Sequence, residues 1–369
     1  SKPTFLLSQK ASTIITEYNE KGFTRANIRS ITAIGESTKN RILVGEYRAI
    51  GEKGVGFKTI FSIASEVKIF SGEYSFSLKD QEPTIPQHIK GPEHPVYGTR
   101  MEIALKDRTS FPTYSDKDIL ELCLCLRQLQ RIQIGSHSVS IDDNGDRRVI
   151  KIDGRQHAFR RFTHVFTITD KEALSERENG SRAISPEQTI TCYVPEKTGL
   201  PEYCLYAGLP TKHKLKIPVA VDAPFELTTS REEIEIDCRS WNNIVRRELY
   251  AALFEVMDKL KESERASIFR FARFVPRLLG NNNRVYVNDI SDSQFLITYP
   301  FLDEIKTKDL IPTFDKKVFT SVSKKDAYRF PSVALTLLDV LESKEFRNIR
   351  PESVIDSTTE GSGLNKEAR

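Results

Sequence analysis

The sequence predicts an α+β fold of two or three domains. Its 369 residues suffice for more than one hydrophobic core, and 38% of them are hydrophobic against 29% charged. Short β-rich runs and amphipathic helical patterns both recur along the chain. One glycine-rich stretch, residues 51–58, lies among the first of these elements. An apolar-periodic run follows it directly.

Composition narrows the class of protein. The chain has no apolar run long enough to cross a membrane, which predicts that it has no membrane partner. Its five cysteines are scattered, and Cys123 and Cys125 do not have zinc-ligand spacing. Buried thiols in a reducing compartment, cytoplasmic or nuclear, are the expectation. A net charge of +4 permits contact with nucleic acid but does not argue for it.

The first elements are two short strands, at residues 4–7 and 13–16, which predict a hairpin. A turn follows at 18–23, and Thr24 is a good N-cap for a helix that continues to about Ala33. Residues 35–50 are polar and flanked by glycines, which favours a mobile lid.

The glycine-rich stretch predicts a loop that feeds into a helix. Glycine permits positive φ and close backbone approach, and free N–H groups at a helix start attract anions such as phosphate. The common phosphate fingerprints do not fit, because Phe57 stands where a Walker A loop needs lysine and Thr59 where a dinucleotide loop needs glycine. The alternative is a tight turn that joins a loop to a packed helix.

The next elements are a strand pair at 67–70 and 74–78, a surface insertion at 80–95, a strand at 97–105 and a helix at 115–129. Further strands are expected at 148–152, 162–168, 189–193 and 215–221, with helices at 170–179, 241–260 and 265–279. Residues 281–350 predict a small α/β segment, and residues 351–369 a disordered tail.

The glycine-rich stretch and the strand pair after it resemble the second glycine box of a known superfamily. This is the gyrase, heat-shock chaperone, histidine kinase and MutL group of ATP-binding domains. The sequence is most similar to the sacsin and NO VEIN type, whose box reads Gly-Glu-Lys-Gly-x-Gly-Phe-Lys. The resemblance implies a two-layer α/β sandwich ATP-binding domain of the Bergerat type at residues 1–138. A ribosomal-protein-like α/β middle domain at 139–280 and a small C-terminal α/β segment would follow.

The resemblance also implies which residues hold the adenine nucleotide. Asn19 and Gly22 match the first glycine box, although Tyr18 stands where the chaperones and MutL carry aspartate. Thr99 matches a threonine that lies beneath the adenine. The residues that would contact the phosphates are Gly35, Ser37, Thr38, Lys39, Gly51, Glu52, Lys53, Gly54, Val55, Gly56 and Phe57. Taken alone, Asn19 could equally be an Asx-turn residue, and Lys39 an exposed loop lysine.

A later stretch, residues 223–234, resembles the signature of the superfamily's middle domain. There a Ser-Arg pair brings an arginine to the terminal phosphate, and Arg231 is the matching residue. Guanidinium suits this role because it stays charged and can bind phosphate through two donors. The alternative is that Arg231 pairs with a neighbouring glutamate, Glu232, Glu233 or Glu235.

The superfamily's hydrolytic residues have no counterpart in the chain. They are a water-orienting glutamate and a magnesium-binding asparagine on a helix before the first strands, whereas this sequence starts at the strands. No catalytic residue and no metal ligand is therefore assigned, and Mg²⁺ is expected only with such a helix. We expect the sequence to begin inside a longer protein.

These observations predict a chaperone-like or MutL-like module that binds ATP. The state of the bound nucleotide would control the position of the lid and the docking of the domains. A nucleotide-dependent dimer and an unidentified protein client are compatible with it. The alternatives are an interaction scaffold that works without nucleotide and a nucleic-acid-associated factor.

Overall fold

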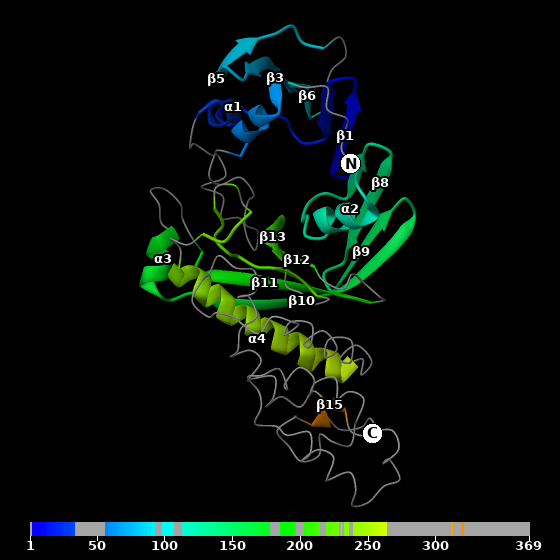
Figure 1. Ribbon diagram of the computed structural model, residues 1–369, viewed down its shortest axis with the longest axis vertical. Helices are drawn as coiled ribbons and strands as arrows, with labels where there is room; N and C mark the ends of the chain where they lie inside the picture. Colours follow the sequence, from blue (N-terminus) through cyan, green and yellow to red (C-terminus); the bar gives the residue numbers. More distant parts are fainter. Residues whose placement is uncertain are drawn as a thin grey trace, which may run out of the picture.

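The computed structural model shows a mixed α/β protein, rich in strands and with few helices (Figure 1). It describes residues 2–33, 56–92, 98–106, 113–177, 185–196, 203–214, 219–228, 230, 232–235, 239–263, 311–312 and 319–320. Fourteen strands form one mixed sheet in the order β13-β12-β14-β11-β10-β9-β8-β7-β1-β2-β6-β3-β4-β5. No helix within the described ranges is long and apolar enough to span a membrane.

Six antiparallel strands make the N-terminal part of the sheet. They are β1 (Thr4–Lys10), β2 (Thr13–Tyr18), β3 (Ala64–Ser71), β4 (Tyr74–Lys79), β5 (Glu82–His88) and β6 (Thr99–Leu105). The predicted β1–β2 hairpin and β3–β4 pair are confirmed. Helix α1 (Arg25–Thr32) begins where predicted, because the Thr24 side chain accepts a hydrogen bond from the Asn27 N–H.

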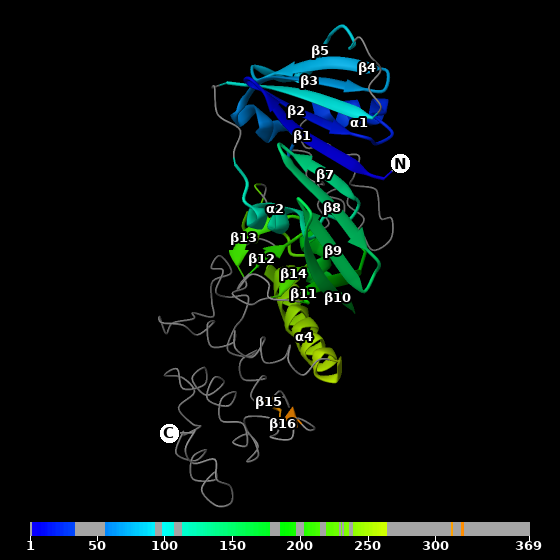
Figure 2. The same cartoon turned by 90° about the vertical axis from the view of Figure 1, so that its right-hand side faces the viewer.

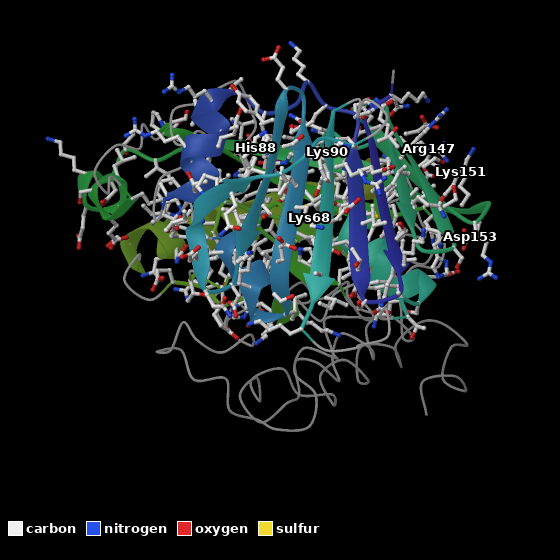
Figure 3. All side chains as sticks on the ribbon, turned by 90° about the horizontal axis from the view of Figure 1, so that it is seen from above. Lys68, His88, Lys90, Arg147, Lys151 and Asp153 are labelled. Atoms are coloured by element: carbon white, nitrogen blue, oxygen red, sulfur yellow. The ribbon has the colours of Figure 1, made fainter. Side chains whose placement is uncertain are left out.

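One face of this part carries a hydrophobic core. Val67, Ile69 and Leu78 are fully buried there, and α1 packs on the same side. On the opposite face of the same strands Lys68 pairs across the sheet with Glu102, and Figure 3 views the face from which Lys68 projects. The alternation of apolar and polar residues along β3 thus gives the sheet one packed side and one polar side.

Three elements differ from the sequence prediction. The run after the glycine box forms only a five-residue 3₁₀ helix, η2 (Lys58–Ser62), because its apolar residues pass directly into β3. The predicted surface insertion contains the edge strand β5. Helix α2 spans Asp116–Cys123, shorter than predicted, since Leu124 and Cys125 are buried in the turn that follows it.

The second part of the sheet joins the first through a parallel pairing of β7 with β1 (Figure 2). Its strands are β7 (Arg131–Ile134), β8 (His137–Asp143), β9 (Arg147–Ile152), β10 (Arg155–Thr167), β11 (Glu187–Pro195), β12 (Cys204–Tyr206), β13 (Pro210–Lys214) and β14 (Ala220–Asp222). The strands predicted at 148–152, 162–168 and 189–193 lie within β9, β10 and β11, or within one residue of their ends.

Helices cover both faces of this second part. Helix α2 packs with Ile150 and Ile152 in one core, whereas α4 (Arg239–Ser263) packs on β10 and β11 in another. Figure 1 shows α2 and α4 on opposite sides of these strands. Helix α3 (Lys171–Arg177) contacts α4, and the buried Trp241 lies near the start of α4.

Other predictions fall on residues outside the described ranges. These are the lid at 35–50, the helix at 265–279, most of the small segment at 281–350 and the tail at 351–369. Within 281–350 the structure describes only the short pair β15 (Ile311–Pro312) and β16 (Phe319–Thr320). The division into domains at 138 and 280 stays a prediction. Four of the cysteines, Cys123, Cys125, Cys192 and Cys204, are buried free thiols.

Candidate functional site

The turn between β2 and α1 carries the first glycine box. Asn19 uses both ends of its side-chain amide on the start of β1: its Oδ1 accepts from the Thr4 N–H at 2.7 Å, and its Nδ2 donates to the Lys2 carbonyl at 2.7 Å. These bonds fix the turn to the neighbouring strand. Asn19 thus has a structural role in this turn.

Two glycines let this turn approach the strands beside it. Gly22 has φ +81°, and a Cβ at that position would lie 3.3 Å from the Gly72 nitrogen. Gly98 has φ +93°, and its Cβ would lie 1.9 Å from the Tyr18 carbonyl oxygen. Only glycine fits this second position, because backbone occupies the space of any side chain. The turn and the start of β6 are therefore in direct contact.

A chain of four hydrogen-bonding groups holds the turn on the ends of β3 and β6. The Phe23 N–H donates to Ser71 Oγ at 2.7 Å, and Ser71 Oγ lies 2.5 Å from Thr99 Oγ1. Thr99 Oγ1 in turn lies 2.8 Å from the Glu20 carboxylate. Because Ser71 Oγ accepts from a backbone N–H and Glu20 can only accept, each hydroxyl donates toward Glu20.

Thr99 and Ser71 are almost fully buried, at 0% and 1% exposed. Thr99 was predicted to lie beside the first glycine box, and the structure brings it there. Ser71 and Glu20 were not predicted. Glu20 stands between Asn19 and Gly22 in the sequence, so its place in the box was a usable signal, whereas a serine at the end of a strand carries no such signal.

The end of the glycine-rich stretch lies on the same core as the turn. Phe57 packs against the same buried cluster as Phe23 and Ile31, and its ring meets Phe61 edge-on at 6.4 Å between centroids. Gly56 has open space on its Cβ side, with no heavy atom within 4 Å among the described residues. The first and second glycine boxes therefore share one hydrophobic cluster, although residues 34–55 separate them in the chain.

Lys58, the last residue of the box, makes contacts that the sequence did not predict. Its Nζ donates to the Ile31 carbonyl at 2.6 Å and to the Pro83 carbonyl. Burial lowers the pKa of this ammonium. Since Ile31 lies in the last turn of α1, Lys58 ties the chain before residue 34 to the chain after residue 55.

Most residues predicted to contact phosphate lie outside the described ranges. They are Gly35, Ser37, Thr38, Lys39, Gly51, Glu52, Lys53, Gly54, Val55 and Arg231. Of the predicted site, the structure thus places Asn19, Gly22, Gly56, Phe57 and Thr99.

The residues around Arg231 form a narrow hairpin. Leu227 and Ile234 form a bridge, and the Thr228 N–H donates to the Glu233 carbonyl at 2.9 Å. Asn242 of α4 binds this hairpin, because its Oδ1 accepts from the Glu226 N–H at 2.8 Å and its Nδ2 donates to the Glu235 carbonyl at 2.9 Å. The residues flanking Arg231 are thereby anchored to the core helix.

Two of the glutamates that could pair with Arg231 already have cationic or imidazole neighbours. Glu232 lies 2.6 Å from Lys212 Nζ, and Glu233 lies 3.2 Å from His213 Nε2. Arg231 itself lies outside the described residues, so both its phosphate role and its pairing with a neighbouring glutamate stay predictions.

Comparison with known proteins gives one partial similarity. No family model matches the chain. A stretch of 84 residues, 23% of the chain, is 33% identical to Protein NO VEIN of Arabidopsis thaliana. The chain spans only 3% of the length of that relative. The similarity supports a relationship to the NO VEIN branch over this part of the chain.

Proposed function

We propose that the chain is an ATP-binding conformational module with a Bergerat-type fold in its N-terminal part. The observation that carries the proposal is the contact between the first glycine turn and the Gly98-Thr99 strand start. It is made through the Glu20–Thr99–Ser71 hydrogen bonds, although Glu20 and Thr99 are 79 positions apart. The similarity to Protein NO VEIN agrees with the resemblance to the NO VEIN type from which this proposal starts.

The described residues fit an adenine nucleotide in two respects. The open side of Gly56 leaves room for a ligand beside the second glycine box. The charged Glu20 carboxylate, held by Thr99, offers an acceptor at the edge of the first box. Bound ATP would supply a polyanion. Residues 35–39 and 51–56 would close on it, and Arg231 would report on its terminal phosphate from the second part of the chain.

We assign no magnesium ligand among the described residues near this site. Glu17, the carboxylate that precedes the first box, lies on β2 and accepts a hydrogen bond from Arg100 at 2.7 Å. It is therefore engaged in an ion pair on the sheet. We propose binding and conformational coupling, with no hydrolytic step assigned to these residues.

Calorimetry with a non-hydrolysable ATP analogue tests the proposal. Replacing Gly54 and Gly56 by alanine together should abolish binding, because the added Cβ atoms would occupy space that the phosphates need beside the backbone. Gly91→Ala is the matched control, since its Cβ would make only an ordinary 3.5 Å contact with Ser75 Oγ. Unchanged affinity in the double variant, with the fold intact by circular dichroism, would remove the phosphate-loop assignment.

A second candidate is an interaction scaffold that uses the fold without nucleotide. It is favoured by the engagement of Asn19 with the backbone of β1 and by Tyr18 in place of an aspartate. The absence of any ATP or ADP binding by the wild-type chain in the same calorimetry would decide for this candidate.

A further inference from the structure

Three potential metal ligands from three separate elements converge on the second part of the sheet. Asp116 is the first residue of α2, His137 is the first residue of β8, and Asp153 lies in the turn between β9 and β10. One ligand atom of each side chain lies within 4.8 Å of the other two. In the part of the chain that the structure describes, no other group of three such residues meets this criterion.

Asp153 is held in place by its neighbours on β8. Its backbone N–H donates to the Ser138 carbonyl at 2.9 Å, and its Oδ1 accepts from the Ser138 N–H at 2.8 Å. Its second oxygen, Oδ2, lies 2.7 Å from His137 Nδ1. The Ser138 N–H and then His137 lower the pKa of this carboxyl, which keeps it charged. One carboxylate oxygen is therefore fixed by the backbone, while the other is hydrogen-bonded to His137 Nδ1. A metal ion ligated through Nδ1 would displace the proton of this bond to solvent. Figure 3 shows Asp153 at the periphery of the sheet, on the same side as Lys151.

Asp116 has a partner that solvent can replace. Its Oδ2 accepts a hydrogen bond at 2.6 Å from Nη1 of Arg155, whose side chain is 77% exposed. Exposed ion pairs of this kind contribute little to stability, because water screens the attraction and both side chains lose freedom. The Arg155 guanidinium thus occupies a position where the carboxylates of Asp116 and Asp153 favour positive charge. A bound metal cation could displace the guanidinium from this position.

We propose that Asp116, His137 and Asp153 form a binding site for a divalent transition-metal ion of the Zn²⁺ type. One imidazole and two carboxylates are ligands that Zn²⁺ accepts, whereas Mg²⁺ favours oxygen ligands alone. Three protein ligands leave the remaining coordination positions to water. The site is separate from the proposed nucleotide site, because its elements belong to the core of α2, β8 and β9.

Metal binding at this position would fasten the start of α2 to two hairpins. His137 begins β8 directly after the β7–β8 turn, and Asp153 lies in the β9–β10 turn. Helix α2 already packs on these strands through Ile119 and Leu120. The ion would therefore add a link between elements whose cores are in contact, and it should stabilise this part of the protein because it binds only the folded arrangement.

Titration of the full, metal-free chain with ZnCl₂ tests the proposal, with calorimetry for affinity and thermal unfolding for stability. We expect one saturable equivalent and a rise in Tm. His137→Ala and Asp116→Asn should each weaken affinity by about tenfold or more and remove the rise in Tm. Arg155→Ala should bind Zn²⁺ more tightly than the wild type, because it removes the competing cation.

Two variants serve as matched controls. His88→Ala removes a histidine at the far edge of the sheet, and Asp142→Asn removes a carboxylate of β8 that lies outside the group. Both should bind Zn²⁺ as the wild type does. The proposal is overturned if Zn²⁺ shows no saturable binding, if His137→Ala retains the wild-type affinity, or if Mg²⁺ binds more tightly than Zn²⁺.

Discussion

Ser71 Oγ and Thr99 Oγ1 lie 2.5 Å apart and are buried where the end of β3 pairs with the start of β6. Through this contact, a chain of hydrogen bonds links the Phe23 N–H to the Glu20 carboxylate. The position of the first glycine turn therefore depends on both of these buried hydroxyl groups.

Thr99→Val should destabilise the protein by about 1–3 kcal/mol, because it leaves the buried Ser71 hydroxyl without its acceptor and Glu20 without its donor. Denaturant unfolding measures this change. Thr13→Val is the control, since Thr13 has the same side chain on β2 and makes no side-chain hydrogen bond to another described residue. If the two variants have the same free energy of unfolding, the hydrogen bonds of the Ser71–Thr99 pair do not stabilise the protein.

Lys58→Met should lower the free energy of unfolding by roughly 1–3 kcal/mol, because it removes a charged donor from the carbonyls of Ile31 and Pro83. Methionine retains most of the apolar stem, so the loss reports on the ammonium. Lys68→Met, on the polar face of β3, should be nearly neutral. A Lys58→Met variant that keeps its stability but loses ATP affinity would instead place Lys58 on the phosphates.

Local signals in the sequence predicted much of the N-terminal part. Thr24 and the β1–β2 hairpin follow from capping and strand patterns within a few residues, and both were predicted correctly. The parallel pairing of β1 with β7 was not predicted, because it joins strands far apart in the chain and depends on tertiary packing. The η2 helix was predicted too long because the apolar residues near Phe61 and Ala64 fit both a helical and a strand periodicity.

The candidate site shows the same limit. The order of the glycine boxes predicted that Gly22 and Thr99 belong together, and the structure brings them together. The contacts of Ser71 and Lys58 could not be predicted, since a serine at a strand end and a lysine at the end of a glycine box are compatible with many partners. Their roles depend on which carbonyls and hydroxyls the fold places beside them.

Arg177→Met should be strongly destabilising, by about 3–5 kcal/mol, because it leaves the buried Glu226 carboxylate without its partner. The two side chains lie 2.8 Å apart at 5% and 4% exposure, and the guanidinium also stacks 4.5 Å from the Trp241 ring centroid. Chemical denaturation of Arg177→Met and of the double variant with Glu226→Met tests this. The double variant should recover part of the loss. If it is no more stable than Arg177→Met, the pair is not the source of the effect.

Arg231→Ala should reduce the preference for ATP over ADP by roughly 1.5–3 kcal/mol if the guanidinium makes one charge-assisted contact with the terminal phosphate. Its affinity for ADP should hardly change. Calorimetry with both nucleotides measures the difference, and Arg246→Ala on α4 provides an arginine control. A parallel fall in both affinities would mean that Arg231 has a structural role and does not sense the terminal phosphate.

Residues 1–369 should bind nucleotide without hydrolysing it above the background rate. Phosphoryl transfer to water needs an oriented water and a metal that holds the phosphate oxygens. Glu17 lies on β2 and is ion-paired with Arg100 of β6, so we do not assign it the role of orienting that water. Lack of a positioned base typically costs about 10²–10⁴ in rate. Phosphate release is measured with and without magnesium, and Glu17→Gln should leave it unchanged. The prediction is wrong if phosphate release depends on magnesium and disappears in Gly54→Ala. That result would mean that this chain contains catalytic groups that its sequence pattern does not indicate.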